Sequence, residues 1–182
     1  TRVSPDSQTQ MQNELGLDPF SENVLMFQRQ WGIERHFDAL DIARRISVNQ
    51  PSTYDFQWAA RSTDMTRAKI WGDFLAEVGK ESQTMVEKTM DHGITHMYVG
   101  KDIKSQWEAL PSDLCVPSGV QERPGIYRIG RLGGKYDVYY NPRASETANS
   151  SQILAIGKAT TAARNMVVAG DAVAPAVLPL QR

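Results

Sequence analysis

The residues best suited to chemistry are a glycine and a lysine that follow an apolar run. In "ILAIGKATT", a predicted strand leads into Gly157, Lys158 and Thr160. Loops that bind nucleotide phosphates begin in this way, but their motif also needs a glycine five positions before Gly157 and a serine or threonine directly after the lysine. Both are missing here. A small nucleotide-binding enzyme that uses these three residues is therefore only an alternative function.

A second Gly-Lys pair lies in "GRLGGKYDVYYNP", between two runs of alternating character. The side chains alternate with a period of two on both sides of Gly133 and Gly134. A two-residue Gly-Gly link between such runs is typical of a tight hairpin, because both central residues of a type I′ turn need a positive φ angle. We therefore predict a hairpin and no phosphate loop, and we interpret residues 126–158 as three neighbouring strands.

The histidines and the single cysteine do not form a recognisable site. His92 and His96 have the spacing of two zinc ligands on a helix, but Gly93 between them is a predicted helix end. His36 stands alone, and surface or capping roles are the better interpretation for all three histidines. Cys115 lies in a proline-rich loop without a histidine nearby in sequence. Cys115 could act as a nucleophile only if a residue distant in sequence activated it. The better interpretation is a half-buried thiol without a catalytic role.

Two pairs of acidic residues could in principle perform acid–base chemistry. They are Asp38 with Asp41, and Glu81 with Glu87. Acids on predicted helices usually form the solvated face, and basic residues stand close enough in sequence to pair with these. The sequence therefore predicts no catalytic residue, no cofactor-binding residue and no metal ligand.

The composition is that of a soluble globular protein. Of the 182 residues, 41% are hydrophobic and 23% are charged, with a formal net charge of −1. This balance indicates no basic face for nucleic acid. One cysteine and the lack of a long apolar run favour an intracellular protein without a membrane span. We also expect a fragment of a longer chain, because the sequence lacks an initiator methionine and stops directly after an apolar run.

Apolar spacing predicts two long helical segments. The first covers about residues 22–46 and is capped by Ser21, either as one kinked helix or as two helices, because Gly32 interrupts the spacing. The clearest helix covers about residues 64–91, where apolar side chains from Ala68 to Met90 recur every three or four residues. Gly93 is its predicted stop signal.

The other predicted elements are short. They are an arm or loose connection at 1–20, a connection at 47–57, a strand at 95–100, a helix at 102–110, a loop at 111–125, a polar linker at 141–151, a strand at 153–157, and extended stretches at 165–170 and 174–180. Trp71 and Trp107 fall on the apolar stripes of their helices and are predicted core residues.

Three tyrosines crowd the second strand of the predicted hairpin. Tyr136, Tyr139 and Tyr140 occupy both of its faces, since neighbouring residues of a strand point to opposite sides. At least one of these faces is then expected to be covered by another element or another subunit. Packing within the chain is the first expectation.

The order of these segments resembles the axial domain of tailed-bacteriophage major capsid proteins, most closely those of contractile-tailed phages. The matching segments are "RAKIWGDFLAEVGKESQTMVEKT", "THMYVG", "KDIKSQWEAL", "YRIGRLGGKYDVYYNP", "ILAIGKA" and "VVAGDAVAPAVLPL". The strongest match covers residues 130–142 followed by 153–158, and "YDFQ" at 54–57 is a weaker one. The resemblance covers roughly residues 54–180 and rests on order and short motifs.

The resemblance implies an α+β fold of the Hong Kong 97 type. Its axial domain would hold a mixed sheet flanked by helices, beside part of a peripheral-domain spine helix. On this basis residues 1–20 are an arm or linker, residues 21–56 belong to the spine-helix portion, and residues 57–182 form the axial domain and a return strand. The chain is shorter than a typical member, since it lacks an obvious extended loop before the first helix and a final peripheral-domain segment.

The function implied by the resemblance is structural. Such subunits form the hexamers and pentamers of an icosahedral phage head, contact other head proteins, and enclose DNA without sequence-specific binding. The implied location is the virion, assembled in the host cytoplasm. The resemblance implies no enzyme activity, no cofactor and no membrane partner. A vertex protein or a nanocompartment shell built on the same fold is a further alternative.

Overall fold

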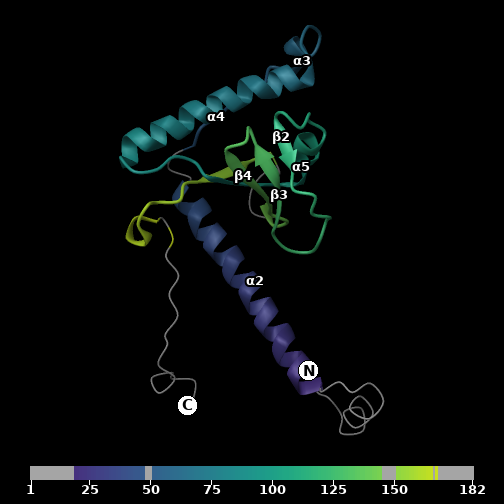
Figure 1. Ribbon diagram of the computed structural model, residues 1–182, viewed down its shortest axis with the longest axis vertical. Helices are drawn as coiled ribbons and strands as arrows, with labels where there is room; N and C mark the ends of the chain where they lie inside the picture. Colours follow the sequence, from purple (N-terminus) through teal and green to yellow (C-terminus); the bar gives the residue numbers. More distant parts are fainter. Residues whose placement is uncertain (1–18, 48–50, 145–150, 166, 168–182) are drawn as a thin grey trace. The chain divides into compact units, whose positions relative to one another are not determined.

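The computed structural model describes residues 19–47, 51–144, 151–165 and 167. The chain divides into two compact units, Thr1–Ile42 and Ala43–Arg182. The elements, labelled in Figure 1 where there is room, are α2 (Pro19–Ser47), α3 (Trp58–Arg61), α4 (Arg67–Thr89), β1 (His96–Val99), α5 (Lys101–Glu108), β2 (Cys115–Pro117), β3 (Tyr127–Leu132), β4 (Tyr136–Tyr140), β5 (Ile153–Ile156) and the 3-10 turn η1 (Ala162–Arg164).

This arrangement confirms the predicted α+β class, with one five-stranded mixed sheet and several helices. No helix in the described ranges has the length and apolar character needed to cross a bilayer. Apart from residues 19, 20, 165 and 167, the predicted arm at 1–20 and the predicted extended stretches at 165–170 and 174–180 lie outside the described residues.

The first predicted helix is one helix, and its predicted cap was wrong. α2 begins at Pro19, so Ser21 lies inside its first turn. Proline suits this position because its fixed φ angle is helical and its missing N–H has no partner in a first turn anyway. The helix also continues through Gly32 to Ser47. The alternative of two helices is therefore wrong.

Gly32 is a weak point of α2, and its replacement is expected to strengthen the helix. A Cβ added there meets no atom within 4 Å. Gly32→Ala should stabilise the helix by about 0.5–1 kcal/mol, because alanine loses less backbone entropy on folding. Amide hydrogen exchange around residues 28–36 should slow by about 2–5-fold. Unchanged exchange would show that α2 does not open independently at this site.

α4 confirms the second helix but with different ends. It runs from Arg67 to Thr89, and Met90 ends it in the left-handed conformation at φ 53°. The Met90 N–H donates to the Val86 carbonyl at 2.7 Å, which satisfies one of the last carbonyl groups. The stop signal is therefore Met90 and not Gly93. Met90 was also expected on the buried stripe, but it is 83% exposed, because its left-handed backbone turns it off the helix.

The hairpin is confirmed, with one residue more than predicted. Gly133 and Gly134 have φ angles of 58° and 70°, and the Lys135 N–H closes the turn on the Leu132 carbonyl at 3.2 Å. Strand pairing resumes with Leu132 opposite Tyr136, so Lys135 is an additional loop residue. The glycines are required because this turn places both central residues at positive φ.

The sheet differs from the predicted row of three neighbouring strands. Its order is β2-β3-β4-β1-β5. β1 lies between β4 and β5, parallel to the first and antiparallel to the second. The segment at 111–125 is not all loop either, because β2 pairs with β3 there. Both differences come from pairing between distant segments, which local periodicity does not report.

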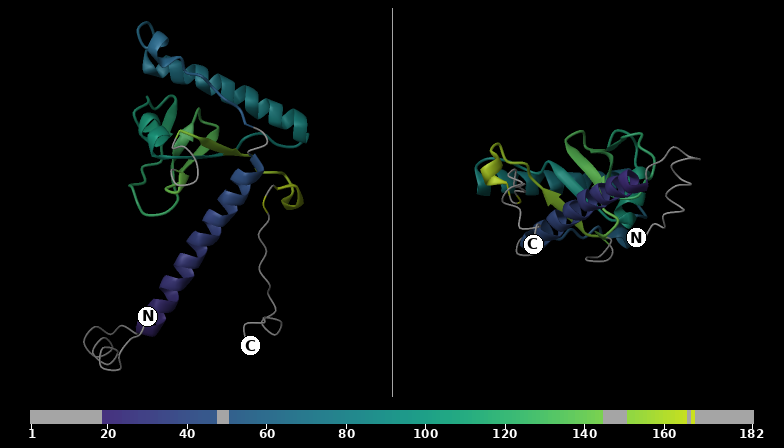
Figure 2. Two further views of the ribbon diagram at one scale, coloured as in Figure 1. Left: turned by 180° about the vertical axis from the view of Figure 1, so that it is seen from behind. Right: turned by 90° about the horizontal axis from the view of Figure 1, so that it is seen from below.

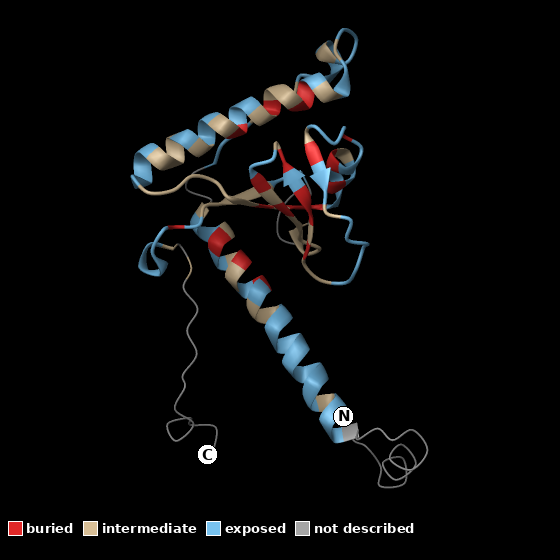
Figure 3. Ribbon diagram, in the orientation of Figure 1, coloured by how far each residue is buried: buried red, intermediate tan, exposed pale blue. Residues whose placement is uncertain are grey.

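The core of the Ala43–Arg182 unit lies between the sheet and the two helices α4 and α5. The views in Figures 1 and 2 agree that α4 runs along the sheet, and Figure 3 shows that buried residues gather on these elements. Tyr54 and Phe56 pack against this core, with ring centroids 5.4 Å from Phe74 in both cases. Trp71 and Trp107 are core residues, as predicted.

Candidate functional site

The loop of Gly157, Lys158 and Thr160 packs against the end of α4. Gly157 follows β5 and lies so close to His92 and Gly93 that an added Cβ would fall 2.3 Å from the His92 ring. The glycine is therefore explained by a close approach of two chain segments. After Lys158 the chain enters the short turn η1 and not an α-helix.

The amide groups that a phosphate would need are occupied by protein acceptors. The Lys158 N–H donates to Thr95 Oγ1 at 3.0 Å, and the Ala159 N–H donates to Asn165 Oδ1 at 3.0 Å. The Thr160 N–H donates to Asp91 Oδ2 at 3.2 Å. A phosphate would have to displace these acceptors and would meet the negative charge of Asp91. The geometry therefore disfavours the nucleotide-binding alternative.

Asp91 is the centre of the polar contacts at this junction. Its carboxylate also accepts the Thr160 hydroxyl at 2.5 Å, lies 3.2 Å from His92 Nδ1, and lies 3.9 Å from the Arg164 guanidinium. The Thr160 hydroxyl contributes most to lowering the pKa of Asp91 to about 2, followed by His92 and the Thr160 amide, against the opposing effect of burial. We call Asp91 and Thr160 the α4–β5 latch.

The latch predicts a pH dependence of stability. The folded pKa of Asp91, about 2, lies below the ordinary value of 3.8, so its stabilisation is complete above about pH 4 and is lost as the pH falls toward 2. Asp91→Asn should lower the Tm at pH 7, and the difference from the unchanged chain should shrink below pH 3. Asp113→Asn, at an exposed turn position, is the control. A difference in Tm that is constant with pH would contradict the role of the carboxylate.

The histidines lie in different surroundings. His92 follows α4, whereas His96 is the first residue of β1, its Nδ1 is 2.6 Å from Thr95 Oγ1, and its ring stacks on Tyr139. His36 is on α2. No group of three or more histidine, cysteine or acidic side chains suited to a metal ion occurs in the described part of the chain.

Cys115 is more deeply buried than predicted. It is 5% exposed and begins β2, and burial raises the pKa of its thiol, with a further contribution from the charge of Glu108. A raised pKa keeps the thiol protonated and poorly nucleophilic. The arrangement therefore favours the interpretation of Cys115 as a core residue.

The two acidic pairs lie on two different helices. Asp38 and Asp41 lie on α2, and Glu81 and Glu87 are exposed on α4. Glu81 accepts a hydrogen bond from the Ser52 hydroxyl at 2.8 Å, which ties the segment before α3 to α4. That contact is structural.

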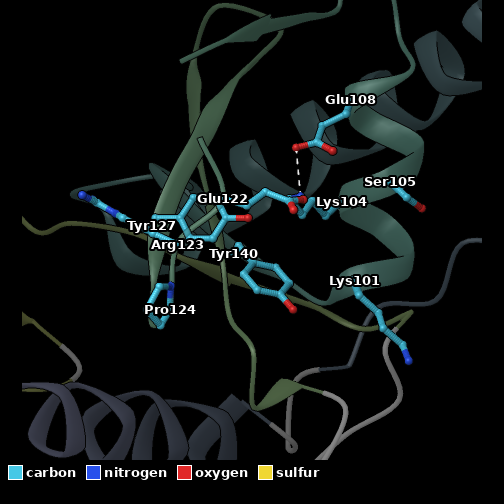
Figure 4. A pocket seen from close by; sticks show the side chains of 9 residues that line it. All are labelled: Lys101, Lys104, Ser105, Glu108, Glu122, Arg123, Pro124, Tyr127 and Tyr140. Atoms are coloured by element: carbon cyan, nitrogen blue, oxygen red, sulfur yellow. Dashed lines mark hydrogen bonds and ion pairs between the residues drawn. The ribbon is translucent and has the colours of Figure 1, made fainter. Parts of the chain in front are cut away.

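An open pocket lies between α5 and the loop before β3. Figure 4 shows Lys104 at its centre, where it is ion-paired with Glu122 and with Glu108 at 3.2 Å. Its ammonium nitrogen is also 5.9 Å and 5.7 Å from the ring centroids of Tyr127 and Tyr140. Burial lowers the pKa of Lys104, but its hydrogen bonds, led by that to Glu122, raise it overall. With these partners Lys104 ties the loop to α5.

The sheet face opposite α4 carries a stack of rings. Tyr139 lies 5.4 Å from Tyr98 and 5.8 Å from His96, measured between ring centroids, and all three residues are half-buried. Tyr136, by contrast, points into the core and is 6% exposed. We call His96, Tyr98 and Tyr139 the aromatic face. The expectation that the tyrosines serve both faces of the strand is confirmed.

Sequence reasoning missed the α4–β5 latch and the surroundings of Lys104. Asp91 and Thr160 are 69 positions apart, and no local pattern joins them. One polar contact could be predicted from the sequence: in the hairpin register Asp137 faces Arg131, and the two form an ion pair at 3.1 Å.

The chain was compared with protein-family models, with curated proteins and with solved structures, and none of them matches it.

Proposed function

We propose that this chain is a structural subunit of an icosahedral bacteriophage head of the Hong Kong 97 type. In this function it forms hexamers and pentamers with copies of itself, contacts other head proteins and encloses DNA. The proposal extends the resemblance, in which the matching segments follow one another in the order helix, strand, helix, hairpin and strand.

The observation that carries the proposal is the two-sided character of the sheet. One face is closed by α4 in the core, while the other presents the aromatic face, whose rings keep part of their surface accessible. Aromatic side chains are enriched at contacts between proteins, because they bury a large area with few rotatable bonds. A shell subunit needs such a second apolar surface in addition to its own core.

The edge strand β5 adds to this support. Its four residues, Ile153–Ile156, are all apolar, and among the described strands it pairs with β1 alone. Edge strands of single-chain proteins commonly carry a charge, a proline or a bulge that prevents further pairing. β2 at the other end of the sheet contains Pro117, whereas β5 contains none of these devices.

The test is the size of the particles formed by the full chain. We expect rings or shells of many copies in electron micrographs, and a matching mass in analytical ultracentrifugation. Tyr139→Lys should reduce assembly, because it places a charge in the aromatic face. Val120→Lys, on an exposed loop, should not. A compact monomer at every concentration would overturn the proposal, and the copy number per particle would separate a major shell subunit from a vertex protein.

A further inference from the structure

The first half of α2 exposes large apolar side chains. Phe27 is 68% exposed, Trp31 is 73% exposed and Val24 is 38% exposed. Figure 3 shows this half of the helix mostly in the colour of exposed residues. These residues all lie in the Thr1–Ile42 unit. Contiguous exposed apolar groups of this size mark surfaces that other molecules cover.

The spacing of these residues is that of a helix-pairing stripe. From Val24 the steps are three residues to Phe27 and four to Trp31, and Phe20 lies four residues before Val24. Alternating steps of three and four keep side chains on one side of a helix and let them interdigitate with those of a second helix. We call Val24, Phe27 and Trp31 the α2 stripe.

The stripe has a defined length. The next positions in the same spacing are Glu34 and Asp38, so the apolar seam stops there. From Phe20 to Trp31 it covers about 18 Å, or about three helical turns. A seam of this length gives a weak contact by itself and a stronger one when many copies are held together.

The residues beside the stripe indicate what covers it. Ser21, Asn23, Gln28 and Gln30 flank it and are all uncharged, whereas Glu22 and Arg29 fall on the opposite side of the helix. A charged partner would need residues of the opposite charge beside the stripe, and these four residues carry no charge. A lipid surface would call for several basic flanks, whereas Arg35, one turn after Trp31, is the basic residue that lies beside the stripe in α2. Between Phe20 and Trp31, a second copy of the same helix meets no like charge across such a seam.

We propose that α2 pairs with α2 of a second copy of this chain through Val24, Phe27 and Trp31. The inference does not rest on the proposed function, because such a pair forms whether or not a closed shell is built.

The first experiment is cysteine cross-linking of the full chain under mild oxidation. Val24→Cys, alone or mixed with Phe27→Cys, is expected to give cross-linked dimers at least about tenfold faster than Met26→Cys. Met26 is the matched control, since it is 67% exposed on the same helix but off the stripe. If the Val24→Cys variant forms dimers by itself, the two helices are parallel. If dimers form only when Val24→Cys is mixed with Phe27→Cys, the two helices are antiparallel. Equal rates at Val24 and Met26 would overturn the proposal.

The second experiment removes the contact. Trp31→Glu should raise the Kd for self-association measured by sedimentation at least about tenfold, whereas Met26→Glu should leave it unchanged. Both positions are exposed, and circular dichroism checks that both variants remain folded. Self-association unaffected by Trp31→Glu would overturn the helix pair while leaving the proposed shell intact. Stripe-dependent binding to lipid vesicles by a chain that is monomeric in solution would also overturn it.

Discussion

Trp107→Ala is expected to lower the free energy of unfolding by about 3–5 kcal/mol, the largest stability loss expected from a single substitution. Trp107 lies on α5, is 0% exposed, and meets Trp71 edge to face at 6.0 Å between ring centroids. Its removal leaves a cavity between α5 and the sheet, because the surrounding strands are held by their own pairing and cannot collapse to fill it. The measurement is urea unfolding at one fixed chain concentration.

Trp107→Phe separates the contribution of the ring's packing from the effect of its indole N–H. The indole N–H of Trp107 is buried and has no hydrogen-bond partner among the described residues, so the tryptophan carries a cost that phenylalanine does not. We expect the phenylalanine variant to lose about 1–2 kcal/mol, less than half the loss of the alanine variant. Equal losses for both variants would show that the indole N–H is satisfied and that the shape of the ring decides the packing.

Gly130→Ala is expected to destabilise the protein by about 2–3 kcal/mol, which is large for the addition of one methyl group. An added Cβ would lie 2.2 Å from the Val116 carbonyl oxygen and 3.3 Å from the Cα of Pro117. Both contacts are with the backbone of β2, which cannot turn away as a side chain could. The strand must move as a whole or detach from β3.

The control for Gly130 is a glycine with free space around it. Gly79 lies within α4, and a Cβ added there meets nothing within 4 Å. Gly79→Ala should therefore stabilise the protein by about 0.5–1 kcal/mol through helix propensity. The two alanine substitutions are expected to have opposite signs in the same unfolding assay. A neutral Gly130→Ala would mean that β2 is loosely held in solution.

Tertiary contacts show why the loop of Gly157 and Lys158 is poorly suited to bind a phosphate. From the sequence, Gly157 and Lys158 are only an alternative phosphate loop, because two residues that the motif requires are missing. The structure shows their neighbouring amides donating to Thr95, Asn165 and Asp91. These acceptors come from other parts of the chain, so no inspection of the motif itself could identify them.

The sequence by itself determined the elements whose signal is local. The stripe of α4 follows from a spacing of three to four residues, and the hairpin follows from alternation around two glycines that adopt positive φ. Both signals report which side of a segment is buried and where the backbone can turn. Each signal is contained in a short stretch of neighbouring residues, which is why these elements could be predicted from the sequence alone.

Only the tertiary structure decided the strand order and the α4–β5 latch. β1 enters between β4 and β5, and β2 forms in a segment that reads as loop. Strand pairing is made by backbone groups that every residue carries, so the sequence does not mark which distant strands will meet. The latch joins Asp91 to Thr160 for the same reason: their proximity is a consequence of how the sheet is ordered, and neither residue signals it alone.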